Sequence, residues 1–329
     1  MTDTASSNRA RASRAKGVST RVAVHGVLAG YTLIAIFPVV LVILNSFKNR
    51  RGIFTDPLGL PGEGTFSLEG YATVLTQGDF ATYFSNSLIV TVTALFLILL
   101  LGAMAAHALA EYRFRFNTLL GIYLILGIMV PIRLGTVAIL ELMVDLNLVN
   151  TLLALILVYT AQGLPVAVFI LTEFMRTLSR DIKDCARVDG LSEYRIFFEV
   201  VVPLIRPVLA TVAVFSMIPI WNDLWFPLIL ASGDATKTVT LGVQQFIGQY
   251  TVNWSAVLAS LSIAILPVLG ALRPVLAPAY RRHHIGRRQG LTPHHPEVRR
   301  SVRTHATRRP QVLWRGQGDP RRRPANQGR

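Results

Sequence analysis

The segment SRDIKDCARVDGLSEYRIFFEVVVPLIRP, residues 179–207, decides how the rest of this sequence is interpreted. Its first half is rich in charged residues, and it stands between two long apolar runs in a chain that is 52% hydrophobic. A mean hydropathy of +0.46 is too apolar for an ordinary soluble domain. We therefore expect the segment to contain a polar loop that joins two membrane-spanning helices.

Six apolar runs have about the length that a helix needs to cross a bilayer, which is roughly 20 residues. These runs cover residues 22–45, 87–109, 118–139, 152–174, 204–231 and 256–272. A barrel strand would instead alternate polar and apolar residues over about ten positions. The sequence predicts an all-α polytopic membrane protein with six transmembrane helices. Its parts are an N-terminal tail (1–21), a transmembrane domain (22–272, with the polar loop at 179–203) and a C-terminal tail (273–329).

Lysine and arginine in the short loops set the expected orientation, because cytoplasmic loops carry an excess of these residues. They gather in the N-terminal tail, in the loop after the second span with Arg113 and Arg115, and in the polar loop. The third and fifth loops carry only Arg133 and Lys237. We expect a multi-pass protein of the cell membrane, with both termini and the polar loop in the cytoplasm.

Residues 273–329 differ in composition from the rest of the chain. They contain fifteen Arg and no Lys, with only Glu297 and Asp319 opposing them, whereas the remainder is close to neutral. Because the segment has few large aliphatic residues, we expect it to be disordered. A basic tail can bind nucleic acid. However, Arg, Pro, His and Gly without Lys is the composition that GC-rich DNA encodes when it is read out of frame.

We interpret this tail as the product of a frameshift near Leu269 and expect no nucleic-acid partner. One permitted choice of codons for residues 270–292, shifted by one base, encodes ALYVLFSRQLIAGITSGAVKG and then a stop, which would complete a sixth span. In the present frame the apolar run ends at Leu272, before Arg273 and Pro274, at the short limit for spanning. An intact frame on resequencing the gene would contradict this interpretation.

Local signals predict two short helices in the polar loop. Ser179 can cap a first helix, and Gly190 suits the left-handed position that ends it. Ser192 can cap a second helix over residues 193–202, which Pro203 is expected to end. The loop is therefore expected to form an L-shaped pair of helices that projects from the membrane.

The residues of this loop are suited to docking another protein. Phe197 and Phe198 lie on the second predicted helix, and Asp184 and Asp189 on or near the first. Exposed aromatic residues beside charges are typical of protein–protein contacts. An amphipathic helix that lies on lipid would show a similar pattern, and the residues alone do not separate the two. We expect Cys185, the single cysteine, to be a small packing residue.

The pattern Asp184-Cys185-Ala186-x-x-Asp189-Gly190, followed by Pro203 and Pro207, resembles the EAA loop of binding-protein-dependent ABC importer permeases. Asp184 stands where the family has Glu, Cys185 where it has Ala, and Leu191 where it has the Ala after the glycine. The resemblance runs from about residue 31 to 269. Further motifs are similar to the carbohydrate branch, specifically the maltose-type second permease subunit: Asn86-Ser87-Leu88-Ile89-Val90, Leu148-Val149-Asn150-Thr151, Gly163-Leu164-Pro165 and Trp221-Asn222-Asp223.

The resemblance implies that the polar loop couples the permease to an ATPase. The residues expected to do so are Asp184, Ala186, Asp189, Gly190, Ser192, Phe197, Phe198 and Pro203. It also implies three protein partners: a second permease subunit that forms a heterodimer, a dimer of the ATP-binding cassette ATPase, and an extracellular solute-binding protein. Membrane lipid is expected to surround the spans. The chain has no G-x-x-x-x-G-K-[ST] loop, so ATP and Mg are expected on the ATPase. We expect no cofactor or metal in this chain.

Polar and aromatic residues near the outer end of the fifth span are candidates for the substrate path. Asn222 and Asp223 could donate and accept hydrogen bonds, and Trp221 and Trp225 could offer aromatic faces to a sugar. Polar residues inside spans tend to face a cavity or a helix partner. The alternative is an aromatic belt at the outer membrane interface. Gln162 is a second candidate, for which an interhelical hydrogen bond is the alternative.

The sequence thus predicts a permease subunit of an ABC importer for a sugar or oligosaccharide, which moves its substrate by alternating access. The same machinery for a non-sugar small solute is the alternative within transport. A membrane-embedded enzyme is the alternative from a different class. No cluster of nucleophile, base or metal ligands in the sequence supports that enzyme.

Overall fold

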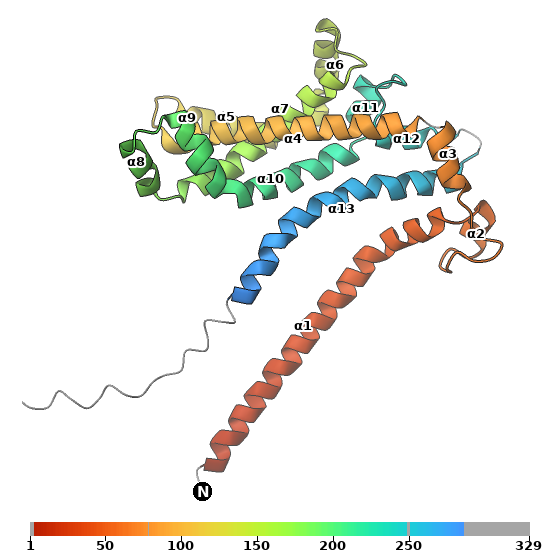
Figure 1. Ribbon diagram of the computed structural model, residues 1–329, viewed down its shortest axis with the longest axis horizontal. Helices are drawn as coiled ribbons and strands as arrows, with labels where there is room; N and C mark the ends of the chain where they lie inside the picture. The colour runs from red at the N-terminus through yellow and green to blue at the C-terminus, as the bar shows by residue number, and fades with distance from the viewer. Residues whose placement is uncertain (1–2, 78, 249–250, 286–329) are drawn as a thin grey trace, which may run out of the picture. The chain divides into compact units, whose positions relative to one another are not determined.

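The computed structural model describes residues 3–77, 79–248 and 251–285, and these residues form helices joined by short connections. Two isolated bridges are the only extended pairings within the described residues. The prediction of an all-α protein is confirmed for this part of the chain. The α-helices are α1 (Asp3–Ser46), α2 (Arg50–Thr55), α3 (Glu69–Gln77), α4 (Phe80–Glu111), α5 (Asn117–Met129), α6 (Thr136–Asp145), α7 (Leu152–Arg176), α8 (Arg180–Val188), α9 (Glu193–Arg195), α10 (Val202–Asn222), α11 (Trp225–Leu230), α12 (Val239–Gln244) and α13 (Trp254–Ile285) (Figure 1).

Four stretches of helix are long and apolar enough to cross a membrane by themselves. They are residues 21–46 of α1, all of α4, all of α7, and the continuous helix over residues 193–222. A shorter apolar helix covers residues 254–270 of α13. The count of six spans therefore stays a prediction, although four of the six predicted apolar runs each coincide with a single helix.

The predicted span over residues 118–139 is wrong as a single helix. It is divided into α5 and a second helical segment, the 3₁₀ turn η1 (Ile132–Gly135) followed by α6, and the two meet at an angle of 85°. Val130, the residue after α5, has extended backbone, and Pro131 follows it. Proline disfavours helical geometry at the residue before it, so the helix stops at this point.

The apolar core lies mainly between α4 and α7, which pack along much of their length, with α10 against both. Small residues allow the close approach: a side chain on Gly163 of α7 would lie 2.4 Å from Ile98 of α4. Such small residues are typical where membrane helices pack closely. A second, smaller apolar cluster joins α3, α12 and the start of α13, through Val74, Val239 and Ala256. Phe80, the first residue of α4, also belongs to this second cluster.

The predicted tails only partly coincide with the described residues. α1 begins at Asp3, inside the predicted N-terminal tail, and α13 continues to Ile285, past the boundary predicted at residues 272–273. Residues 286–329 lie outside the described residues. Their expected disorder and the frameshift interpretation therefore stay predictions.

Candidate coupling loop and substrate path

α8 begins and ends as the sequence signals predicted. The Ser179 hydroxyl oxygen accepts a hydrogen bond of 3.2 Å from a backbone N–H of the first turn. At the other end Gly190 has φ +79°, in the left-handed region. The N–H groups of Leu191 and Gly190 donate to the carbonyls of Ala186 and Arg187, at 3.1 and 3.0 Å. This pair of bonds is the Schellman closure that a glycine after a helix permits, and it sets the corner of the loop.

The second arm of the loop starts at the predicted residue but does not end where predicted. Ser192 caps α9 by accepting from the N–H of Arg195 at 3.5 Å. The helix then passes through a π-helical turn, η2 (Ile196–Val201), into α10 without a break. In that turn the N–H of Val202 donates to Phe197, five residues back, and Pro203 falls in the first turn of α10. Proline is tolerated in a first turn, so the prediction that Pro203 ends this helix is wrong.

The structure divides the predicted coupling residues between an exposed surface and the core. Phe197 is only 5% exposed, and its ring lies 5.4 Å from that of His107, so the expectation that it is exposed is wrong. Ala186 is buried as well, and Pro203 is partly buried. Both buried side chains belong to the main apolar cluster. The predicted residues that remain exposed are Asp184, Asp189, Gly190, Ser192 and Phe198.

An ionic cluster that the sequence analysis missed connects this corner to the end of α4. Arg187 of α8 donates to Asp184 at 2.7 Å, to Glu193 at 2.8 Å and to Glu111, the last residue of α4, at 2.9 Å. The Tyr112 hydroxyl donates to Glu193 at 2.8 Å. Hydrogen bonds to Glu193 and Glu111 raise the pKa of the Arg187 guanidinium above its usual value. Arg187 therefore joins three segments as a permanent cation.

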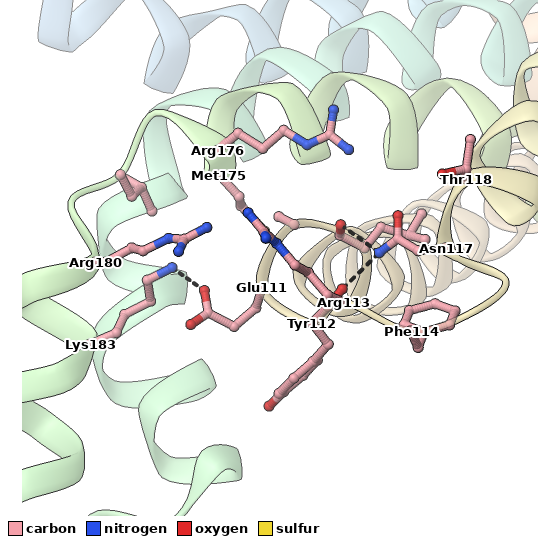
Figure 2. Close-up of a pocket in the computed structure, with 13 residues that line it drawn as sticks. Glu111, Tyr112, Arg113, Phe114, Asn117, Thr118, Met175, Arg176, Arg180 and Lys183 are labelled. Carbon is pink, nitrogen blue, oxygen red and sulfur yellow. Dashed lines mark hydrogen bonds and ion pairs between the residues drawn. The ribbon is translucent and has the colours of Figure 1, made fainter. Parts of the chain in front are cut away.

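Lys183 completes this cluster from the preceding turn of α8. Its ammonium pairs with Glu111, as Figure 2 shows, and the two side chains are only 8% and 10% exposed. Breaking a buried ion pair by removing one partner leaves an uncompensated charge and is strongly destabilising. Lys183 and Arg187 are four residues apart and so share one face of α8. That spacing was the signal in the sequence from which an acidic partner could have been predicted. We use the name Arg187 cluster for five side chains: Glu111, Lys183 and Arg187 at the centre, and Asp184 and Glu193 beside them.

Asp223, a candidate for the substrate path, has several partners within the protein. Its carboxylate accepts from the Tyr159 hydroxyl at 2.9 Å and from the N–H groups of Phe226 and Trp225 at 3.0 and 3.3 Å. The guanidinium of Arg133 lies 3.7 Å away, and the Asp223 side chain is 10% exposed. The helix is interrupted here, between α10 and α11. The prediction that the fifth span continues as one helix to residue 231 is therefore wrong. Asp223 stabilises that break.

Trp225 lies beside the same break and remains accessible. Its indole N–H donates to the Thr136 hydroxyl at 3.0 Å, and the Arg133 guanidinium lies over its ring at 5.7 Å from the centroid. The side chain is 41% exposed. Arg133 covers part of the ring and Thr136 orients it, and the surface that stays exposed can still receive a ligand.

The other three candidates are not brought together. Trp221 is 3% exposed and donates to the carbonyl of Ala264, so it packs α10 on α13. Asn222 is exposed and lines a cavity of about 460 Å³ between α1, α10 and α13, whose other lining residues are apolar. Gln162 is exposed on α7 and is not among the residues that line this cavity. Asn222 is therefore the candidate with a cavity beside it.

The long apolar helices, with a polar corner between α7 and α10, define the class of polytopic helical membrane proteins. Residues 98–282 match the family model described as "Binding-protein-dependent transport system inner membrane component". The chain belongs to this family. It is a transporter subunit of the inner membrane and not an enzyme.

Individual relatives agree with this family. The chain is 34% identical over 247 residues to the diacetylchitobiose uptake system permease protein NgcG of Streptomyces coelicolor, covering 74% of this chain and 81% of the relative. It is 30% identical to the arabinooligosaccharides transport system permease protein AraQ of Halalkalibacterium halodurans, covering 72% and 85%. A bacterial ABC transporter that imports alginate has the same fold, with a TM-score of 0.68 at 21% identity over 81% of this chain and 97% of that chain.

Proposed function

We propose that this chain is a permease subunit of an ABC importer for a sugar or oligosaccharide. The named substrates of its relatives, diacetylchitobiose and arabinooligosaccharides, support a carbohydrate substrate. The chain would move its substrate by alternating access, driven by a separate ATPase that binds ATP and Mg. It would pair with a second permease subunit and receive its substrate from an extracellular solute-binding protein.

The observation that carries the proposal is the connection of an exposed corner to a long helix. Asp184 on α8, Asp189 just after it and Phe198 on η2 offer an exposed surface, and this surface would dock on the ATPase. The Arg187 cluster joins α8 to the last residue of α4 through hydrogen-bonded ion pairs. Displacement of α8 by the ATPase would therefore move α4 and its packed partner α7 as a unit, which is the rigid-body type of switching transition.

The orientation follows from the arginines near this corner. Arg113 follows α4, Arg176 ends α7 and Arg180 begins α8, so one end of these helices carries several cations. Cytoplasmic loops are enriched in such residues. We infer that the corner and both termini face the cytoplasm, and that the break at Asp223 lies toward the outer side of the membrane.

For the substrate path we retain Asn222 and Trp225, because both side chains remain accessible near the outer end of α10. Gln162 stays a candidate on α7. Asp223 would act indirectly, since its carboxylate is engaged with Tyr159 and with the start of α11. The buried Trp221 would support the position of α10 rather than touch a sugar.

The docking role is tested by Gly190→Val, because a β-branched residue at φ +79° is strained and would change the corner. Gly64→Val is the matched control: it also has φ +79°, and neither glycine has an atom near enough to clash with an added side chain. We expect Gly190→Val to abolish co-purification of the ATPase and sugar uptake, and Gly64→Val to retain the ATPase. Retention of the ATPase and of uptake in Gly190→Val would refute the docking role.

A further inference from the structure

A basic cavity of about 430 Å³ lies where α4, α5, α7 and α8 come together. Its lining includes four cationic side chains, Arg113, Arg176, Arg180 and Lys183, and one carboxylate, Glu111. Figure 2 shows Arg176, Arg180 and Lys183 reaching it from α7 and α8, with Arg113 entering from the chain after α4. The volume falls within the range typical of small-ligand sites. The charge favours an anion.

The single carboxylate does not neutralise these cations. Glu111 is already paired with Lys183 and Arg187 of the Arg187 cluster. Arg176 pairs with Glu173 on a surface where both side chains are more than half exposed. Arg113 and Arg180 form no ion pair with any carboxylate in the described part of the chain. Two guanidinium groups in one cavity thus remain available, and such groups match the oxygens of a phosphate in two-bond geometry.

An apolar groove of about 230 Å³ adjoins this cavity. The two share Leu109, Asn117, Thr118 and Arg176 along their linings. Beyond these shared residues the groove runs between α5 and α7, where most lining residues are apolar, among them Gly121, Ile122, Ile125, Val168 and Phe169. Thr172 and Glu173 are its other polar lining residues, and Glu173 is paired with Arg176. Both helices belong to the apolar segments of the chain. A charged cavity continued by an apolar groove is complementary to a charged group with hydrocarbon attached.

We infer that the cavity and the groove together bind an anionic phospholipid of the cytoplasmic leaflet. Its phosphate contacts Arg113 and Arg180, and an acyl chain lies in the groove between α5 and α7. Basic pockets between membrane helices on the cytoplasmic side are suited to such headgroups. The inference rests on the orientation proposed above. The lipid touches both the turn after α4 and the first residue of α8, so it occupies a position beside the coupling corner.

The apolar groove decides between this ligand and two others with the same anionic chemistry. A free phosphate would use the arginines but would gain nothing from the space along α5 and α7. An acidic segment of the ATPase would likewise leave the groove empty. A phospholipid alone among these three fills both parts, because it combines the phosphate with hydrocarbon.

The first test measures lipid binding to the assembled importer in detergent, by titration with fluorescent phosphatidylglycerol and with phosphatidylcholine for comparison. Each cation near an anionic lipid contributes about fivefold in affinity, so Arg113→Gln with Arg180→Gln should weaken phosphatidylglycerol binding roughly 25-fold. Arg115→Gln is the matched control, since Arg115 is in the same turn but does not line the cavity. Unchanged binding in the double variant, or equal binding of phosphatidylcholine in the wild type, would overturn the inference.

The second test addresses the groove without touching a charge. Gly121 lines the groove, and an added Cβ there would have no other atom within 4 Å, so the side chain of Gly121→Leu should project into the groove. Gly30→Leu on α1 is the control, because that glycine also has open space. Phosphatidylglycerol binding should fall in Gly121→Leu only, and glycerol phosphate should not compete. Equal binding in both glycine variants, or full competition by glycerol phosphate, would indicate a free phosphate site instead.

The same variants separate this inference from the proposed coupling role. Loss of the ATPase from the arginine double variant, with phosphatidylglycerol still bound, would assign the cavity to the ATPase and overturn the lipid site. Conversely, a failure of Gly190→Val to affect the ATPase would refute the docking role and leave the lipid measurements unaffected. The docking role is therefore tested by co-purification of the ATPase, and the lipid site by binding of phosphatidylglycerol.

Discussion

Arg187 of α8 donates a hydrogen bond of 2.9 Å to Glu111, the last residue of α4, and so connects the exposed corner at Gly190 to the longest helix of the main apolar core. Lys183 pairs with the same carboxylate from one turn earlier on α8. Both contacts join residues more than seventy positions apart in the chain. They define how movement at the exposed corner would reach the membrane helices.

Glu111→Gln should destabilise the protein by about 3 kcal/mol, because Lys183 then stays buried without its anion. The measurement is the thermal unfolding temperature of the purified complex. Glu173→Gln is the control: its pair with Arg176 is exposed and should be worth less than about 1 kcal/mol. Equal unfolding temperatures for wild type and Glu111→Gln would contradict a structural role for the cluster.

The neighbouring phenylalanines should separate stability from docking. Phe197→Ala should cost about 3–5 kcal/mol of stability, because the ring is buried in the main apolar cluster. Phe198→Ala should leave the unfolding temperature nearly unchanged, since that ring is 51% exposed. It should instead weaken ATPase binding by tenfold or more, as expected for an aromatic residue central to an interface. Binding of the ATPase at wild-type affinity by Phe198→Ala would exclude Phe198 from the contact.

Tyr159→Phe should lower stability by about 1–3 kcal/mol, because the nearly buried Asp223 carboxylate loses a hydrogen-bond donor. Tyr31→Phe, which changes a 72% exposed residue of α1, should have no such effect. Thermal unfolding of both variants makes the comparison. If the two tyrosine variants unfold at the same temperature, the Asp223 contacts do not stabilise the break between α10 and α11.

Asn222→Ala should raise the apparent KM for oligosaccharide uptake about tenfold, because a sugar would lose one hydrogen bond in the cavity that Asn222 lines. Assembly with the ATPase should be unchanged, since Asn222 lies at the opposite end of α10 from the coupling corner. Uptake assays across a range of substrate concentrations provide the measurement. An unchanged KM would remove Asn222 from the substrate path.

The parts of the structure that were predictable from sequence are those whose causes are local. Ser179 and Gly190 delimit α8 through hydrogen bonds within a few residues, so the chain itself encodes the corner. The break at Pro131 was also open to prediction, because it follows from the geometry of one residue and its neighbour. The continuation past Pro203 was not, since the sequence gives no sign of the π-helical turn that directly precedes this proline.

The remaining features depend on residues far apart in the chain. Glu111 gives no sign in the sequence that it pairs with Lys183, and Asp223 gives none that it binds Tyr159. Phe197 and Phe198 are adjacent and chemically identical, yet one faces the core and the other the surface. Only the packing of α4, α7 and the η2 turn decides which is which.

The most direct test of the coupling account uses Cys185, the single cysteine of this chain, which is exposed on α8, so the expectation that it packs against a neighbour is wrong. Labelling of this subunit by a membrane-impermeant maleimide reports on which side of the membrane Cys185 lies. It also reports whether the bound ATPase covers Cys185. The account predicts rapid labelling in inside-out vesicles, no labelling in right-side-out vesicles, and protection when the ATPase is bound. Labelling from outside, or equal labelling with and without the ATPase, would contradict it.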